Sequence, residues 1–342
     1  MNAGFVALIL YALNGIRIAR QRNALPVLVY GEKDVPYFYE ADRGPWVWEY
    51  YFKPISLVSY EKLQQWLDYG IVTDNQVHVN TPEEAIQGHQ YDEDRLATFW
   101  AWEAPKDKMA WMHEKRALGR KFLKEHLQIK PQIEALANQF AEKYFQENDL
   151  IGVHIRGTDF HYADPIPISR YFEAIEEWVR TKQLTKFQVF VATDQQQFVQ
   201  QFEEKYPGKI LTTNALRSSN HIAPFKKEGV SPYKKGVDVL VDILLLSRCH
   251  YLIKGAAAVG EFATWFADEQ IPILDFALES EFKRVKYYKL RSAYLRLNVS
   301  NKNRMGLWLL GAGEFFIKCF MYFPMTRFLF NKYGWARKIL KH

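Results

Sequence analysis

The segment 150–160, LIGVHIRGTDF, combines an apolar run with side chains that can carry out chemistry. Side chains alternate across a strand, so His154 and Arg156 point to the same face near the carboxyl end of this run. A guanidinium is costly to bury without an anionic partner. The partner is either a carboxylate, with Asp159 or Asp242 as candidates, or a ligand phosphate, which a planar guanidinium holds with two hydrogen bonds.

Further polar residues follow other apolar runs. FVATD ends in Thr193 and Asp194, for which capping of the next helix is favoured over ligand contact. YLIKGAAAVGEF passes through Lys254 and small residues into a helix, which fits either tight packing or phosphate binding at a helix N-terminus. Asp238 and Asp242 lie one turn apart on an apolar helix and need donors, which backbone amides, Arg156 or a nucleotide base would provide.

Elements that could position these residues alternate regularly from residue 150 onward. Strands are expected at 150–155, 187–193, 209–213, 250–255 and 271–276, and helices at 168–180, 196–206, 236–248 and 258–269. This alternation is typical of a parallel, doubly wound sheet, in which ligands bind outside the carboxyl ends of the strands.

The N-terminal half reads as a less regular α/β unit. Helices are expected at 5–22, 82–104, 107–127 and from Pro131 to before Asn148, with a strand at 25–30 and irregular structure at 36–54. We therefore predict an acceptor-side domain at 1–147, a nucleotide-sugar domain at 148–281 and a tail at 282–342.

Composition excludes several classes of protein. The 342 residues are 48% hydrophobic and 25% charged, which is typical of a globular chain and not of a disordered one. Two distant cysteines argue against a disulfide scaffold or a structural zinc site. The apolar run at 4–13 is too short for a membrane span and has no basic residue before it, so we expect a buried helix and no targeting signal.

The tail differs in charge from the rest of the chain. From Phe282 onward there are 14 Lys and Arg residues and one acid, a net of +13, so the first 281 residues carry −7. In 305–342 aromatic and basic residues interleave, which favours a helix lying on an anionic membrane surface. A helix packing back on the protein and a nucleic-acid patch are the alternatives, and nucleic acid is the least favoured.

Four segments together resemble a known group. VHIRGTD (153–159) resembles the His-x-Arg motif of the GT-B fucosyltransferases, above all the core α1,6-fucosyltransferases and the rhizobial nodulation fucosyltransferases, with protein-O-fucosyltransferases as relatives. The segments PISRYFEAIEEWV (167–179), VFVATDQQQFVQQFEEKYP (189–207) and VDILLLSRCHYLIKG (241–255) follow in the order of that group. The resemblance covers about residues 136–275.

This resemblance implies a GT-B-like α/β fold of two Rossmann-like domains, the C-terminal one being the parallel doubly wound sheet, followed by the basic aromatic tail. It also implies inverting transfer of fucose from GDP-fucose with no metal and no cofactor. His154 and Asp242 would read the guanine, and Arg156 would hold the diphosphate and stabilise its charge as it departs. Donor binding is expected at His154, Arg156, Thr158, Asp242, Lys254, Ala257 and Ala258.

The sequence departs from the group at two places. Gly157 stands where the related enzymes have a second arginine, and Ala256, Ala257 and Ala258 stand where they have phosphate-binding serines. Backbone amides and the charge of Lys254 are the expected substitutes. Another nucleotide sugar therefore stays open as the donor, as does a catalytically lapsed scaffold that binds glycans or membranes.

An inverting transfer needs a general base for the acceptor hydroxyl. The loop 160–166 provides Asp164, which is the favoured base, and His161; Asp159 in the preceding turn is a third candidate. Asp164 precedes Pro165, so an ordinary turn explains it equally well. The expected acceptor is a lipopolysaccharide-type, O-antigen or lipid-linked glycan, and the expected location is peripheral, on the cytoplasmic face of the cell membrane.

Overall fold

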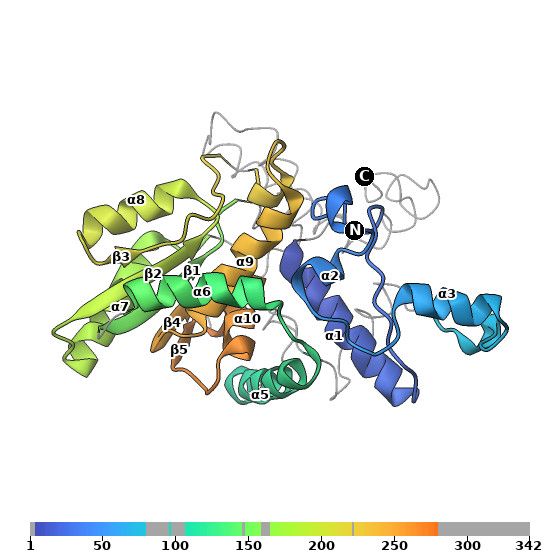
Figure 1. The fold of residues 1–342 in the computed structure, drawn as a ribbon. Coiled ribbons are helices and arrows are strands. Elements are labelled where there is room, and N and C mark those ends of the chain that lie inside the picture. Colours follow the sequence, from blue (N-terminus) through green and yellow to red (C-terminus); the bar gives the residue numbers. More distant parts are fainter. Residues whose placement is uncertain are drawn as a thin grey trace, which may run out of the picture. The chain divides into compact units, whose positions relative to one another are not determined.

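The computed structural model describes residues 4–79, 96, 107–145, 148–158, 165–220 and 222–279. The expected helix at 82–104, apart from Leu96, lies outside the described residues, as do the loop 159–164 and the tail 282–342. The described part of the chain is built around one five-stranded parallel sheet (Figure 1).

The strands follow the order β3-β2-β1-β4-β5 across this sheet. They are β1 (Asp149–Ile155), β2 (Phe187–Thr193), β3 (Ile210–Leu211), β4 (Tyr251–Lys254) and β5 (Ile273–Asp275). All four pairings are parallel, as the alternating sequence predicts, although β3 and β5 are shorter than expected. The chain moves outward from β1 in one direction and then restarts at β4 on the other side, so the topological switch point lies between β1 and β4.

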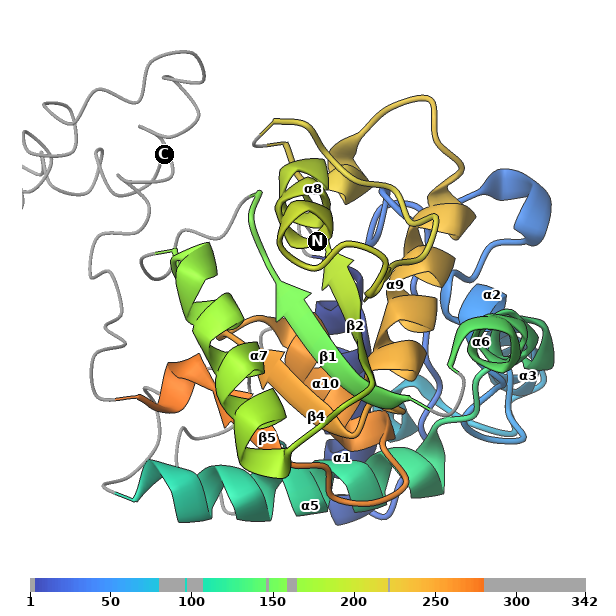
Figure 2. The same cartoon turned by 90° about the vertical axis from the view of Figure 1, so that its left-hand side faces the viewer.

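Helices cover both faces of the sheet (Figure 2). Apolar side chains of β1 at odd positions, such as Ile151 and Val153, pack with α7 (Ile168–Lys182) and α8 (Gln196–Lys205). The opposite face packs with α6 (Pro131–Tyr144), α9 (Pro232–Leu246) and α10 (Ala258–Phe266). His154 is at an even position, so it belongs to the α9 and α10 face, and Arg156 follows the end of β1.

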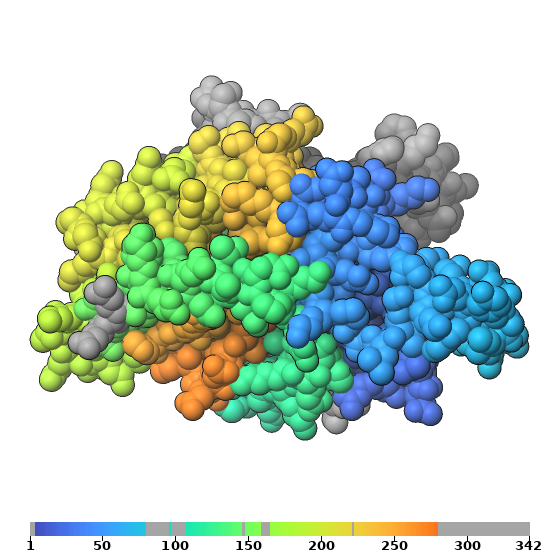
Figure 3. Space-filling model, viewed as in Figure 1, coloured from blue at the N-terminus to red at the C-terminus, as the bar shows by residue number. Residues whose placement is uncertain are grey.

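Helix α9 begins one turn before its expected start. The Ser231 side chain accepts a hydrogen bond from the Lys234 backbone N–H at 3.2 Å, and Pro232 occupies the first helical position. A capping serine followed by proline is a strong start signal. The buried apolar residues of α9 then pack against α6 and the sheet, and Figure 3 shows α6 and α9 as one continuous surface.

The N-terminal region consists, in its described residues, of helices joined by irregular segments. It contains α1 (Phe5–Gln21), α2 (Trp48–Tyr51), α3 (Tyr60–Asp68) and α5 (Lys108–His126). Short 3₁₀ helices lie at Ala41–Arg43, Asp74–Gln76, Pro224–Lys226 and Phe276–Leu278. Helix α1 is buried along its apolar face, as predicted, and shares one hydrophobic core with α9 and α10.

The strand expected at 25–30 is wrong. These residues pair with no strand among the described residues; one of their backbone groups, Tyr30 O, accepts a hydrogen bond from Val47 N–H at 2.9 Å. Among the described residues before β1 there is no strand ladder, only an isolated bridge between Phe52 and Ile129. A second Rossmann-like domain and the boundaries at 147 and 281 therefore stay predictions. No helix in the described ranges is long and apolar enough to cross a membrane.

Candidate functional site

The carboxyl ends of three adjacent strands place polar side chains in one row. In the sheet register His154 of β1 pairs with Lys254 of β4, and Lys254 pairs with Asp275 of β5. Paired residues of parallel strands share a face, so the three side chains lie side by side beneath α10. This row is at the switch point, where open α/β sheets bind their ligands.

Arg156 forms an ion pair with a carboxylate at the end of the neighbouring strand β2. Its Nε lies 3.2 Å from Oδ2 of Asp194, which follows β2. Asp194 also accepts hydrogen bonds from Gly157 N–H at 2.7 Å, Thr158 N–H at 3.3 Å and the Thr158 hydroxyl at 2.6 Å. One carboxylate therefore holds both the guanidinium and the turn that carries it.

Two sequence-based expectations are corrected by this arrangement. The carboxylate paired with Arg156 is Asp194 and not Asp242, and Asp159 lies outside the described residues. Asp194 does not cap α8, whose N-cap is Gln195 without a side-chain cap bond. The hydroxyl of Thr158 donates to Asp194 and so helps to orient the turn, and donor binding by Thr158 stays a prediction.

His154 is a neutral, buried imidazole. Its side chain lies against α10, because a Cβ added at Gly260 would sit 3.0 Å from His154 Nδ1. Burial lowers the pKa of His154 to about 3, assisted by the positive charges of Arg156 and Lys254. Nδ1 is buried and has no hydrogen-bond partner among the described residues. A neutral imidazole at this position can donate or accept one hydrogen bond toward a bound molecule.

Asp242 of α9 lies on the same side of the sheet as His154. A Cβ on Gly152 would sit 3.2 Å from Leu246 Cδ2, which fixes α9 against β1. One turn before Leu246 is Asp242, and two residues after Gly152 is His154. The step from Leu246 back to Asp242 along α9 and the step from Gly152 on to His154 along β1 are similar in length. Both steps run in the same direction, because a helix that connects parallel strands runs antiparallel to them.

The donors around the acidic residues of α9 come from the loop after β3. Asp242 Oδ1 accepts from the Thr213 hydroxyl at 2.7 Å, and Asp238 accepts from Leu216 N–H at 3.0 Å and from Lys234. None of these hydrogen bonds to Asp238 and Asp242 comes from Arg156. Burial raises the pKa of Asp242 to about 6, although the Thr213 hydrogen bond and the charge of Arg217 oppose the rise.

Arg217 is a residue that the sequence analysis missed. Its guanidinium donates to Ala215 O at 3.3 Å and to the Thr212 hydroxyl, next to the Thr213 that contacts Asp242. Its Nε is buried with no partner in the described ranges. No local pattern marks this arginine; only the nearby Asp238 and Asp242 on an apolar helix indicate that a cation is needed.

Lys254 is placed differently from its expected role. It is 0% exposed, and its Nζ lies 2.7 Å from Asp275 Oδ2 and 3.0 Å from Glu261 Oε2. Two carboxylates already neutralise this ammonium, and solvent does not reach it. The assignment of Lys254 to phosphate binding is therefore not supported; Asp275 and Glu261 are its partners.

The alanines expected to bind the donor begin α10. Ala257 is the N-cap in extended conformation, and Ala258 is the first helical residue. The N-cap residue forms no side-chain cap bond. As in any helix, the first-turn amides lack intrahelical acceptors and lie at the positive end of the helix dipole. Any contact from Ala257 and Ala258 to a phosphate would come from the backbone.

Gly157 is closely surrounded by two side chains at the start of α8. A Cβ at this position would lie 2.3 Å from Gln195 Oε1 and 2.6 Å from Phe198 Cε2. Gln195 is itself held by a 3.1 Å hydrogen bond from Nε2 to Asn220 O. The space into which a larger residue would extend is therefore filled by the start of α8.

The catalytic-base candidates Asp164, His161 and Asp159 lie outside the described residues, so their assignment stays a prediction. Within the described ranges no group of three or more His, Cys, Asp or Glu residues is placed to hold a metal ion.

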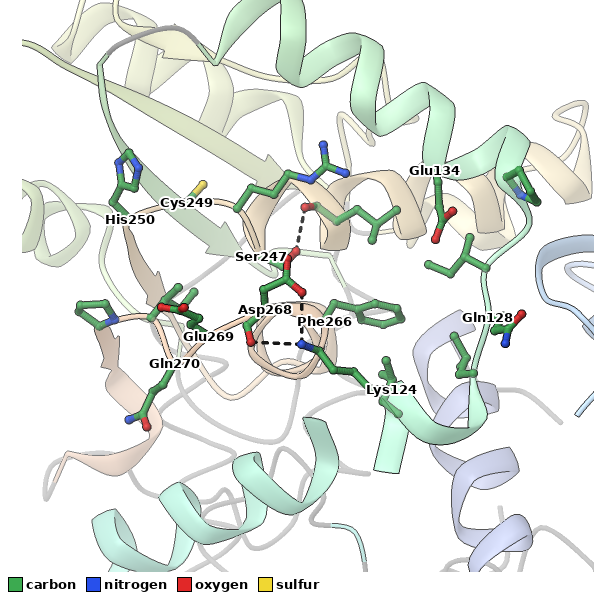
Figure 4. Close-up of a pocket in the computed structure, with 18 of the residues that line it drawn as sticks. Lys124, Gln128, Glu134, Ser247, Cys249, His250, Phe266, Asp268, Glu269 and Gln270 are labelled. Carbon is green, nitrogen blue, oxygen red and sulfur yellow. Dashed lines mark hydrogen bonds and ion pairs between the residues drawn. The ribbon is translucent and has the colours of Figure 1, made fainter. Parts of the chain in front are cut away.

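A cleft of about 760 Å³ lies away from this edge (Figure 4). Its lining includes His250 and Pro272, which precede β4 and β5, together with Lys124 and Asp268, which point toward each other in Figure 4. The cleft thus lies at the amino ends of the strands. Ligands of such sheets bind at the carboxyl ends, so this cleft is not the candidate site.

Comparison with known proteins gives one family. Residues 117–256 match the model for the N- and catalytic domains of alpha-(1,6)-fucosyltransferase. This match confirms the fucosyltransferase-like resemblance of the motifs and, with it, a glycosyltransferase. No curated protein matches the chain.

Solved structures of fucosyltransferases are also similar. NodZ alpha-1,6-fucosyltransferase co-crystallized with GDP gives a TM-score of 0.47 at 16% identity, covering 82% of this chain and 94% of that chain. Fucosyltransferase NodZ from Bradyrhizobium gives 0.47 at 17% identity, covering 82% and 95%. POFUT1 in complex with GDP-fucose gives 0.34 at 11% identity, covering 48% and 50%.

Proposed function

We propose, from the fucosyltransferase match over residues 117–256, that this chain is an inverting, metal-independent glycosyltransferase that transfers fucose from GDP-fucose to a glycan. The observation that carries the proposal is the Arg156–Asp194 arrangement at the switch point of the sheet. It presents a partly exposed, oriented guanidinium where a diphosphate would bind.

The diphosphate contacts follow from the geometry of this edge. Arg156 retains 25% of its side-chain exposure, so part of the side chain is accessible. The uncapped N-terminus of α10, with Ala257 and Ala258, would add backbone donors to the same phosphates. A guanidinium and amides held in advance stabilise the charge that develops on the leaving GDP without reorganisation.

The base contacts are proposed for His154, Asp242 and Arg217. The Watson–Crick edge of guanine presents two N–H donors beside the O6 acceptor. An ionised Asp242 would accept from the donors, and the neighbouring Arg217 would donate to O6, which is an arrangement that uracil and cytosine cannot match. Thr213 holds Asp242 in place.

The remaining parts of the function rest on the sequence. We propose Asp164 as the general base, and a lipopolysaccharide-type, O-antigen or lipid-linked glycan as acceptor. The tail 305–342 would hold the enzyme on the cytoplasmic face of an anionic membrane, and an acceptor domain at 1–147 would complete a GT-B fold.

Calorimetric titration with GDP, UDP, CMP and their sugars tests the donor. Tight binding of GDP and GDP-fucose, with at least tenfold weaker binding of the other two nucleotides, is expected. Tighter binding of UDP or CMP would mean that the donor is another nucleotide sugar, with the fold assignment unchanged. No binding of any nucleotide, together with no hydrolysis of any sugar donor, would make the chain a lapsed scaffold.

A donor other than GDP-fucose is the second candidate, because two features at the phosphate site differ from the related enzymes. Gly157 stands where they have a second arginine and cannot be enlarged without moving Gln195 and Phe198. Lys254, the expected substitute cation, is bound to Asp275 and Glu261.

A further inference from the structure

Four charged side chains, three of them buried and one half-buried, lie directly beneath the candidate donor site. Arg116 of α5 forms a two-pronged ion pair with Glu261 of α10, with Nε 2.9 Å from Oε1 and Nη2 2.7 Å from Oε2. Arg116 also contacts Asp275, and Lys254 contacts both Glu261 and Asp275. We call these residues the four-charge cluster: Arg116, Lys254, Glu261 and Asp275.

The cluster is electrically balanced. It contains two cations and two anions, and each cation contacts both anions. Burial alone would raise the pKa of Glu261, but attraction to Arg116 and Lys254 outweighs it, so the pKa is lowered and the carboxylate is ionised. Removing one member would leave an uncompensated charge in the interior.

The bonds of the cluster reach the elements that face the ligand. Glu261 lies in the first turn of α10. Lys254 Nζ also donates to Gly255 O at 3.3 Å, which ties down the loop between β4 and α10. A Cβ on Gly260 would lie 3.0 Å from both His154 Nδ1 and Lys254 Cβ, so this helix turn is in direct van der Waals contact with the strand ends.

Helix α5 approaches α10 along one stripe of residues. Arg116 contacts Glu261, and Arg120 Nε donates to Thr264 O at 3.3 Å. Between them, a Cβ on Gly119 would lie 2.6 Å from the Trp265 ring. The two helices are thus in close contact. Of the two arginines, only Arg116 contacts the first turn of α10.

We propose that Arg116 is a positioning residue for donor binding: through Glu261 it fixes the N-terminal turn of α10 and the 255–257 loop relative to His154 and Arg156. This inference rests on the proposed function, since it assumes that the α10 N-terminus and His154 contact the nucleotide. It assigns α5, which lies outside the donor-binding sheet, to the donor site.

A paired substitution separates positioning from stability. Arg116→Met with Glu261→Met removes one cation and one anion and leaves Lys254 paired with Asp275, so no charge is stranded and the protein should fold. Arg120→Met is the matched control, because it removes an α5–α10 contact one turn away from the cluster. A displacement of about 1 Å can cost on the order of 100-fold in catalysis. We expect the double variant to lose tenfold or more in GDP affinity and in kcat/KM, and Arg120→Met less than twofold.

Arg116→Lys gives a second comparison. It keeps the charge but cannot form the two-pronged bond with Glu261. We expect an intermediate loss of GDP affinity with the folded fraction, measured by circular dichroism, unchanged. Hydrogen exchange of residues 255–261 in ligand-free protein should quicken in this variant and in the double variant, and stay unchanged in Arg120→Met.

The outcomes are distinct. A folded double variant that binds GDP and turns over as the unaltered protein does would reduce the cluster to a structural role and overturn the proposal. Unaltered protein that binds no GDP would remove the proposed function, and hydrogen exchange would then still decide whether Arg116 positions the loop and helix turn. Unchanged exchange at 255–261 would overturn that positioning as well.

Discussion

Asp194 offers the sharpest perturbation of the site. Its carboxylate accepts from Gly157 N–H, from Thr158 N–H and hydroxyl, and from Arg156 Nε. Asp194→Asn keeps the shape but places an NH₂ donor where one oxygen stood. Turned one way, the amide faces Gly157 N–H; turned the other way, it faces Thr158 N–H and Arg156. At least one backbone or guanidinium donor loses its acceptor in either orientation.

The expected cost follows from these bonds. A buried donor left without a partner costs about 1–3 kcal/mol, and bonds to a neutral acceptor are weaker than bonds to a carboxylate by roughly 1 kcal/mol. Arg156 is partly exposed, so we discount its share for solvent screening. We expect the free energy of unfolding to fall by about 2–4 kcal/mol, and kcat/KM for GDP-fucose to fall about 100-fold as Arg156 loses its orientation.

Denaturant unfolding and steady-state kinetics on the same preparations measure both effects. Thr158→Val removes only the hydroxyl bond and should cost about 1 kcal/mol in unfolding free energy, with a smaller loss of activity. Asp268→Asn is the control, because that carboxylate is exposed at the opposite end of the strands. An Asp194→Asn enzyme that keeps kcat/KM within twofold would show that Arg156 does not depend on Asp194 for its catalytic geometry.

Three further outcomes are expected. Arg156→Lys should lower turnover by two orders of magnitude or more, because an ammonium cannot replace the two-pronged grip, and full activity of Arg156→Ala would refute the assignment. The pKa of Asp242 is about 6, so GDP affinity should fall as pH drops below 6; calorimetry that shows no such fall would remove Asp242 from the base site. The raised pKa also means that Asp242 destabilises the fold above pH 6 and not below pH 4, so Asp242→Asn should raise the melting temperature at pH 8. The same substitution should lower the affinity for GDP more than the affinity for UDP. Removal of 305–342 should abolish sedimentation with anionic vesicles and leave activity on a soluble acceptor nearly intact; an insoluble truncation, or an intact chain that ignores vesicles, would instead favour a packing role.

The sequence predicts the sheet well because its strands are short apolar runs separated by strongly amphipathic helices. The placement of His154 near the carboxyl end of β1 and of Asp242 on α9 follows from the period of the apolar residues around them. Segments without a helix or strand period, such as 25–30, are predicted less well, because residue propensity cannot show whether a partner strand exists.

Long-range ion pairs are what the sequence analysis could not supply. Arg116 and Glu261 are 145 residues apart, and no spacing rule links them. A signal was present all the same: one acid in the apolar helix AVGEFATWF implies a buried cation nearby. Asp194 resembled a helix cap because it precedes α8, yet a carboxylate at the strand end next to Arg156 was an equally good ion-pair partner.

The packing around Gly157 constrains how the phosphate site could change. Gln195 and Phe198 fill the volume that a side chain at this position would need. A second arginine there would force the ends of these two side chains into new positions, and Gln195 would lose its 3.1 Å hydrogen bond from Nε2 to Asn220 O. The cost of acquiring that charge therefore falls on side chains at the start of α8 and not on the backbone of β1. An evolving or engineered enzyme would gain the new arginine most easily together with smaller residues at 195 and 198.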